Sequence, residues 1–514
     1  MSFSLIIRNG DVIDGTGDRP PFRADVGVTG DVITAVDDLS TAKADREIDA
    51  SGRVVSPGFI DVHVHGEIAL LGTPDQYGEV QQGITTQLLA PDGFGWARLA
   101  GARAQELWEY TLFAYGNVDI EPPWNSIDGY LSLFDRRTPS NVVSQVPHCA
   151  IRAEVMGWEA RVATDDELKQ MEALTREWME AGACALNLGL DYQPSSSADF
   201  RELVALCKVV AEYDGIYAAH QRYHILGREP AWRETMDLSR EAGIPVHVSH
   251  ERVDEISGPL LDEVEREDID LTFESYLYSA GMTHMTMMLP MEYQHGSPVE
   301  VLERLRDPAV RANSLPVLRE KLGIADQICG FTRSGKHTGR RLRDLAQEAN
   351  SSPESFAYDL LLEEAGLQAF VFPWQVPEEE AQHAVEATAR HPLMMIASDG
   401  IYNIPHPHPR GMGCFARVLG EFVRDRGILT LEEAVSRMSA FPADRFRIPD
   451  RGRIEVGRAA DLVLFDPDTV AAQSTYENPR RPPLGIDDVI VNGEAVIAEG
   501  MPTGVMSGRV VHRR

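Results

Sequence analysis

Five polar residues that are able to bind a metal ion stand at the ends of apolar stretches of this chain. GFIDVHVH ends with His63 and His65, IYAAH with His220, IPVHVSH with His250, and LMMIASD with Asp399. Imidazole nitrogen and carboxylate oxygen are ligands of zinc and related divalent ions. A single buried histidine is more often a hydrogen-bonded core residue. The interpretation therefore depends on whether the fold brings these residues together.

The stretches around these residues predict a barrel. In the middle of the chain, helix-like and strand-like stretches alternate. The helical pattern TDDELKQMEALTREWMEAGA opens with the capping-box pair Thr164 and Glu167, and the strand-like CALNLGL follows it. Such alternation favours a parallel sheet with right-handed crossovers, and the number of units favours an α/β fold of the (β/α)8 TIM-barrel type. An open doubly wound sheet is the alternative, but no GxGxxG phosphate loop supports it.

The barrel fold predicts where the five polar residues lie. In such barrels the carboxyl ends of the strands meet at one mouth, where active sites are built. His63 and His65 are two positions apart, so on a strand both side chains point to the same side. We therefore expect the histidines and Asp399 to converge on a metal site with nitrogen and oxygen ligands.

The two ends of the chain differ from its middle. They consist of short stretches in which apolar and polar residues alternate, separated by turns. SLIIRNGDVIDG near the start resembles IDDVIVNGEAVIAEG near the end in this respect. These stretches predict one small β-sandwich domain formed by residues 1–56 and 445–514, with the barrel in residues 57–444. The alternation breaks from about 286 to 345, which predicts an insertion or lid over the site.

The composition narrows the possible partners. The chain has 514 residues, 43% of them hydrophobic and 25% charged, with a net charge of -32. This charge argues against binding to nucleic acid or to an anionic membrane, because both need a basic surface. No signal-peptide core is recognised, and no apolar run approaches the roughly 20 residues of a membrane span. Five scattered cysteines without CxxC spacing fit a reducing cytosol, so we expect a cytoplasmic protein. The oligomeric state is left open.

Several motifs resemble those of a known superfamily. PGFIDVHVH, the strand-end histidines, the late SDG and the closing GRAADLVLFDP resemble the amidohydrolase superfamily. Within it, QQGITT, GLDYQP, GIPVHVSH and HPRGMGCFARVLGEF resemble the N-acyl-D-amino-acid deacylases (D-aminoacylases), and the resemblance covers essentially the whole chain. It implies a hydrolase of linear amides that uses one or two zinc or other divalent ions. It also implies His63, His65 and Asp399 at one metal position, with His220 and His250 at a second.

The chain departs from the family pattern at positions that matter for the site. Asp92, in LLAPDGFG, stands where the family has a metal-bound cysteine, and we expect it to be a ligand; the alternative is a turn aspartate. Arg252 replaces a lysine that holds the substrate carboxylate. Tyr192 and Tyr278 match tyrosines that the family places at the substrate. Arg410, in the HPRG loop, is a further candidate for a substrate contact, and a structural ion pair is equally expected.

These residues predict a mechanism in which Asp399 takes a proton from a metal-activated water and passes it to the leaving amine. The resemblance implies a small-molecule substrate, an N-acyl-D-amino acid. A cyclic-amide hydrolase of the hydantoinase or dihydroorotase type, or a deaminase, is the alternative. Such barrels often carry a carboxylated lysine at a strand end, and no suitable lysine is found. A non-catalytic scaffold is a third possibility, and the retained histidines argue against it.

Overall fold

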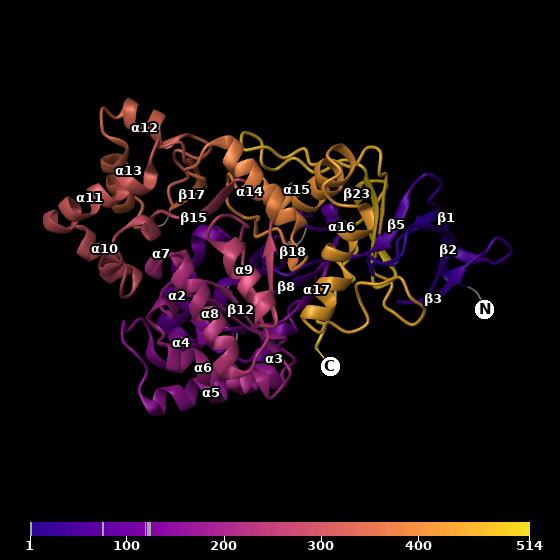
Figure 1. Ribbon diagram of the computed structural model, residues 1–514, viewed down its shortest axis with the longest axis horizontal. Coiled ribbons are helices and arrows are strands. Elements are labelled where there is room, and N and C mark those ends of the chain that lie inside the picture. Colours follow the sequence, from indigo (N-terminus) through magenta and orange to yellow (C-terminus); the bar gives the residue numbers. More distant parts are fainter. Residues whose placement is uncertain (1–2, 74–76, 119, 121–124, 367, 514) are drawn as a thin grey trace.

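Parallel strands form the centre of the molecule, and helices surround them (Figure 1). The computed structural model describes residues 3–73, 77–118, 120, 125–366 and 368–513. The central strands are β6 (Phe59–Asp61), β8 (Ile84–Leu88), β9 (Asn141–Val143), β10 (Val146–Pro147), β11 (Ala185–Gly189), β12 (Ile216–His220), β13 (Val246–Val248), β14 (Leu271–Ser275) and β18 (Met394–Ile396).

These strands close into a ring. They form two parallel sheets, one with the order β6-β8-β9 and one running from β10 through β14 to β18. Only Ser144 and Gln145 separate β9 from β10, so the two strands occupy one position in the ring. On the other side, the backbone N–H of Ser398 donates to the Asp61 carboxylate at 3.0 Å, which ties β18 to β6. The described strands therefore occupy eight positions in sequence order, and the predicted (β/α)8 barrel is confirmed.

The outer helices bury one face each against the strands. They include α4 (His148–Met156), α5 (Asp165–Glu180), α6 (Phe200–Ala211), α8 (Arg228–Ala242), α9 (Ser257–Arg266), α14 (Glu378–Arg390) and α16 (Leu431–Met438). Helix α5 begins with the predicted capping box, in which Thr164 and Glu167 satisfy each other's backbone N–H groups. Its side chains Leu168, Met171 and Trp178 recur at helical spacing and are buried. No helix in the described ranges is long and apolar enough to cross a membrane.

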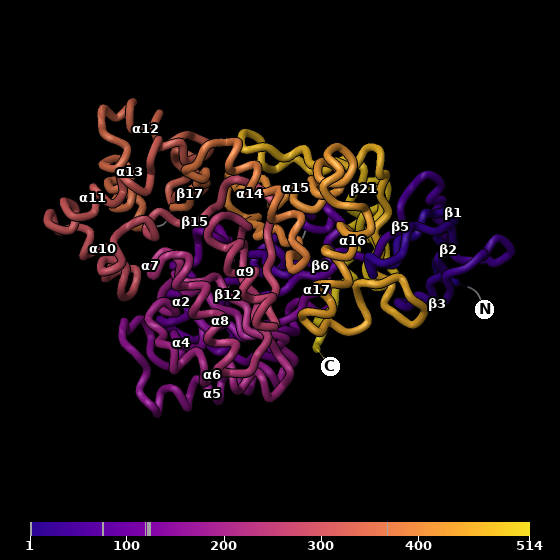
Figure 2. Tube along the Cα trace, viewed as in Figure 1, coloured from indigo at the N-terminus to yellow at the C-terminus, as the bar shows by residue number. Residues whose placement is uncertain are grey.

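The two ends of the chain build one sheet beside the barrel. Figure 2 shows the indigo and yellow segments together at the right. The strands are β1 (Phe3–Val12), β2 (Phe22–Thr29), β3 (Val32–Asp37), β4 (Ala44–Asp49), β5 (Val54–Pro57), β20 (Leu462–Phe465), β21 (Ile486–Val491), β22 (Glu494–Ala498) and β23 (Met501–Pro502), all hydrogen-bonded in a single nine-stranded sheet.

Successive side chains along these strands point to opposite faces of the sheet, and both faces are apolar. Val55 and Leu464 pack into a core on one face. Their neighbours Val54 and Val463 pack into the large core that the sheet shares with the barrel. Because β5 ends at Pro57 and β6 begins at Phe59, the sheet anchors the barrel strand that leads to His63.

An antiparallel insertion separates the last two barrel strands. It contains β15 (Ala280–His284), β16 (Ile328–Thr332) and β17 (Gln368–Pro373), with the helices α10 (Pro298–Leu305), α11 (Pro308–Leu322), α12 (Leu342–Glu348) and α13 (Pro353–Glu363). The inserted segment therefore extends beyond the expected range of 286–345 on both sides. Its helices lie at the opposite end of the molecule from β1, β2 and β3 (Figure 1).

Candidate metal centre

The strand-end residues meet at one mouth of the barrel. His65 ends the short strand β7 (Val64–His65), His220 ends β12, and His250 follows β13 by two residues. Asp399 follows β18 and binds back through its backbone N–H to the carbonyl of His63 at 2.8 Å. The His63 and His65 rings lie with their centroids 5.8 Å apart, as expected for two side chains on the same side of a strand.

Two carboxylates face the first pair of histidines. Nε2 of His63 lies 3.7 Å from Oδ1 of Asp92 and 3.8 Å from Oδ1 of Asp399. Nε2 of His65 lies 3.4 Å from the same Asp399 oxygen and 3.7 Å from Oδ2 of Asp92. Asp92 thus offers one oxygen to each histidine. Two groups of donor atoms have the spacing of a metal site: His63, His65 and Asp399 in one, and His63, Asp92 and His250 in the other.

These atoms fit a divalent metal better than a hydrogen-bonded cluster. Ligand atoms of a tetrahedral zinc lie about 3.4 Å from one another, which follows from bond lengths of about 2.0–2.1 Å. The separations above are close to this value. Nε2 of His63 and Oδ1 of Asp92 are buried and have no hydrogen-bond partner in the part of the chain that the structure describes. Buried polar atoms are rarely left unpaired, so a cation bound between these two atoms would give each of them the partner that it lacks.

His220 and His250 form the second pair. Nδ1 of His220 lies 2.9 Å from Nε2 of His250, and the other ring nitrogen of His220 contacts the Asp191 carboxylate at 3.1 Å. Burial and the neighbouring histidines lower the pKa of both rings to about 3, so both are neutral at pH 7 and able to act as ligands.

The backbone around Asp92 is held in an unusual conformation. Ala90 and Asp92 have φ angles of 62° and 55°, in the left-handed region that residues other than glycine seldom adopt. The Glu67 carboxylate accepts a hydrogen bond from the N–H of Ala90 and another, at 2.7 Å, from the hydroxyl of Tyr115. This turn directs the Asp92 side chain into the site, a placement that fits a ligand better than a turn-stabilising residue.

Arg410 pairs with Asp399. Its Nη2 lies 2.8 Å from Oδ2 of Asp399, and its guanidinium lies 4.4 Å from the ring centre of Tyr276. Burial favours the neutral acid, but the charge of Arg410, with His65 and His63, holds the pKa of Asp399 well below its usual range. Asp92 has no arginine in direct contact among the described residues, and burial raises its pKa to about 7. A bound cation would lower this pKa again.

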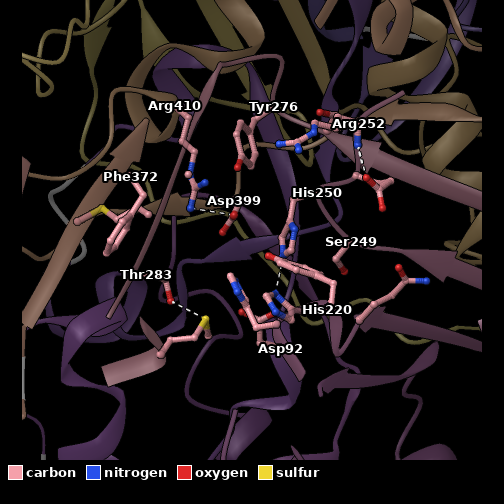
Figure 3. A pocket seen from close by; sticks show the side chains of 18 of the residues that line it. Asp92, His220, Ser249, His250, Arg252, Tyr276, Thr283, Phe372, Asp399 and Arg410 are labelled. Carbon is pink, nitrogen blue, oxygen red and sulfur yellow. Dashed lines mark hydrogen bonds and ion pairs between the residues drawn. The ribbon is translucent and has the colours of Figure 1, made fainter. Parts of the chain in front are cut away.

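A cavity of about 360 Å³ opens onto these residues. This volume is within the range of small-molecule sites. Figure 3 shows Asp399 at its centre, with Arg410, Tyr276 and Arg252 along one side. Residues of the insertion complete the wall, among them Thr283 and Phe372.

Three of the four predicted substrate residues line this cavity. Arg252 stacks 4.4 Å from the Trp374 ring centre and donates through Nε to Asp254 at 2.9 Å. Tyr192 lies 3.3 Å from the Thr283 hydroxyl, and Arg410 lines the cavity beside Asp399.

The fourth predicted substrate residue, Tyr278, lies elsewhere. It is buried beneath Arg417, whose guanidinium lies 4.2 Å from its ring centre, and Tyr276 lines the cavity instead. The expected contact of Tyr278 with a substrate does not fit this placement. The cause is local: Leu277 has a φ of 56°, so the alternation of a regular strand does not continue through it.

Comparison with known proteins identifies the family. The model of the amidohydrolase family matches residues 46–497. The chain belongs to the amidohydrolase family. It is 34% identical to the D-aminoacylase of Alcaligenes xylosoxydans xylosoxydans over 525 aligned residues, which cover 99% of this chain and 98% of that protein.

Solved structures agree with this assignment. An N-acyl-D-glutamate deacylase from Bordetella bronchiseptica, complexed with zinc and a phosphonate that mimics the tetrahedral intermediate, matches over 100% of both chains with a TM-score of 0.83 and 29% identity. A D-aminoacylase described as having a binuclear metal centre matches 99% of this chain and 100% of its own, with a TM-score of 0.81 and 32% identity.

Two acidic residues of this amidohydrolase contact the histidines and were not expected from the sequence. The Glu274 carboxylate lies 2.9 Å from Nδ1 of His63, and the Asp191 carboxylate contacts His220 as given above. The sequence does contain a sign of Glu274. It is the one acidic residue in the strand-like stretch LTFESY, from Leu271 to Tyr276. Asp191 lies in the GLDYQP motif, directly before Tyr192.

Proposed function

We propose that this chain is a zinc-dependent hydrolase that cleaves N-acyl-D-amino acids into a carboxylate and a D-amino acid. The observation that carries the proposal is the arrangement of Asp92 and Asp399, two buried carboxylates that face His63 and His65 inside a small-molecule cavity. The full-length similarity to D-aminoacylase and to a zinc-bound N-acyl-D-glutamate deacylase supports the substrate class.

The proposed ligand roles follow the family pattern. His63, His65 and Asp399 would hold one divalent ion, and His220 and His250 a second. The spacing of the donor atoms supports the first set, and it places an oxygen of Asp92 within reach of His63 and His250, where it would be a further ligand. A divalent metal in this place supplies a Lewis acid for the amide carbonyl and lowers the pKa of a bound water. Carboxylate oxygen is a harder ligand than the family's thiolate, and zinc accepts both.

Asp399 is the proposed general base and acid. It accepts the proton of the attacking water, whose oxygen bonds to the carbonyl carbon of the amide. As the C–N bond breaks, Asp399 returns this proton to the nitrogen, so that the leaving group is a neutral amine. Arg410 keeps Asp399 ionised before the reaction through its contact of 2.8 Å.

Two arginines form a positively charged side of the cavity, to which the carboxylate of the substrate would bind. Arg252 and Arg410 lie on either side of Tyr276 and both line the cavity (Figure 3). Charged hydrogen bonds from a guanidinium suit a planar carboxylate. No lysine is among the described residues that line the cavity, so the carboxylated-lysine bridge of cyclic-amide hydrolases has no counterpart there.

A hydrolysis screen tests the proposal. The purified chain, loaded with zinc, manganese or cobalt, is assayed with N-acyl-D-amino acids, N-acyl-L-amino acids and cyclic amides, and its metal content is measured. We expect metal-dependent release of D-amino acids. Turnover of cyclic amides alone would favour the hydantoinase-type alternative, and a chain without bound metal and without any turnover would favour a non-catalytic scaffold.

A further inference from the structure

Glu274 touches three histidines from a single buried position. It lies on β14 and is 1% exposed. Its Oε1 accepts hydrogen bonds from Nδ1 of His63 at 2.9 Å and from the backbone N–H of His250 at 2.8 Å. Its Oε2 lies 2.6 Å from Nε2 of His247. The reaction proposed above uses neither Glu274 nor His247.

At His63 the contact determines which ring nitrogen is free. When Nδ1–H donates to Glu274, Nε2 carries the lone pair, and Nε2 is the atom that faces Asp92 and Asp399. Carboxylates commonly orient metal-bound histidines in this way, and they increase the electron density on the ligating nitrogen.

At His250 the same oxygen holds the backbone. His250 has a φ of 37°, a conformation that costs energy for a residue with a side chain and that surrounding contacts must stabilise. The hydrogen bond from its N–H to Glu274 is one such contact. This hydrogen bond fixes the backbone from which the His250 side chain extends. Nε2 of that side chain lies 2.9 Å from Nδ1 of His220.

His247 lies against the other oxygen of the carboxylate. Its Nδ1 lies 2.8 Å from the hydroxyl of Thr272, and its Nε2 faces Oε2 of Glu274. The two oxygens of Glu274 thus have separate neighbours, and Oε1 serves the two ligand residues.

We infer that Glu274 is a positioning residue that couples the two metal positions, because one oxygen orients a ligand of the first position and a ligand of the second. This inference rests on the proposed metal-dependent function. Its consequence is specific: the loss of Glu274 weakens metal binding at both positions, whereas the loss of one histidine ligand acts mainly on its own position.

Metal titration of the whole chain tests this coupling without any activity measurement. The metal-free forms of the wild type, Glu274→Gln and His220→Ala are titrated with Zn²⁺ in competition with a chromophoric chelator, and Co²⁺ absorption spectra report the ligand geometry. Loss of a residue that orients a metal ligand typically lowers affinity by about 10–100-fold. We expect Glu274→Gln to weaken both binding steps by this factor and to change the Co²⁺ spectrum, and His220→Ala to weaken mainly one step.

Glu79→Gln is the matched control. Glu79 is also 1% exposed, and it is not among the residues that line the cavity or contact the histidines. Its affinity and spectrum should equal those of the wild type. Glu274→Ala, checked for folding by circular dichroism, removes the hydrogen bonds as well as the charge and should bind still more weakly; if it fails to fold, Glu274→Gln decides.

Each remaining result has a definite meaning. Unchanged affinities in Glu274→Gln, or the loss of only one step, would overturn the coupling while leaving the proposed function intact. A wild type that binds a single ion would also overturn it. A wild type that binds no divalent ion would overturn the proposed function itself, and the coupling with it.

Discussion

Replacing Arg252 with methionine should remove selectivity for a substrate carboxylate. Methionine keeps apolar contact with Trp374, on which the Arg252 guanidinium stacks at 4.4 Å, but it carries no charge. Arg252 donates through Nε to Asp254, and its two Nη groups have no hydrogen-bond partner among the described residues. These groups are therefore free to bind a carboxylate in the cavity.

The size of the effect follows from exposure. A hydrogen bond to a charged partner contributes about 1.5–3 kcal/mol when it is well shielded. The Arg252 side chain is 32% exposed, so solvent screening reduces the expected value to about 1–2 kcal/mol. This corresponds to a loss of about 5–30-fold in kcat/KM. Because the contact is present in the bound substrate as well as in the transition state, most of the loss should be in KM.

A pair of substrates separates this role from a general defect. The best N-acyl-D-amino acid from the screen is compared with its carboxamide, which has the same shape without the negative charge. Arg252→Met should lose activity toward the acid and change little toward the carboxamide. Arg233→Met, on the outer helix α8, is the control and should affect neither. An equal loss on both substrates would show that Arg252 acts through the local fold, and the anchoring role would be refuted.

Three further predictions concern the metal, the proton transfer and the stability. Asp92→Ala should reduce the number of metal ions bound per chain, as measured by elemental analysis, and an unchanged number would leave Asp92 as a turn residue. Asp399→Asn should abolish turnover while metal remains bound, and near-normal turnover would remove Asp399 from the mechanism. Burial raises the pKa of Glu79 from 4.5 to about 7 in the folded chain, so stability falls as the pH rises from 4.5 to 7. Glu79→Gln should therefore stabilise the chain by about 3 kcal/mol more at pH 8 than at pH 4.5, and urea unfolding that gives equal differences at both would contradict this.

The barrel and the strand-end residues were accessible from the sequence for a physical reason. A parallel strand buried on both sides reads as an apolar run, so a polar residue at its end is conspicuous. His220 and Asp399 both stand out in this way, and the barrel topology alone brings their strand ends to one mouth.

Other features depend on contacts that a linear pattern does not contain. Glu274 lies 211 positions from His63 along the chain, and nothing local to either residue indicates that they touch. The choice between Tyr276 and Tyr278 depends on the left-handed backbone of Leu277. The insertion extends beyond its expected range because β15 and β17, which pair with each other antiparallel, lie on either side of that range.

The buried negative charge explains why the site suits a cation. A cluster of histidines without these carboxylates would not require one. His247 differs from His63: it is buried beside the same cluster, but its Nδ1 contacts the Thr272 hydroxyl and its Nε2 faces a single carboxylate, that of Glu274. Around His63 the carboxylates of Asp92, Asp399 and Glu274 bring three negative charges when ionised, and Arg410 contacts only that of Asp399. Uncompensated negative charge in a buried place is unfavourable unless cations balance it. Divalent ions supply such charge, so the acids, more than the histidines, make this mouth of the barrel a metal site.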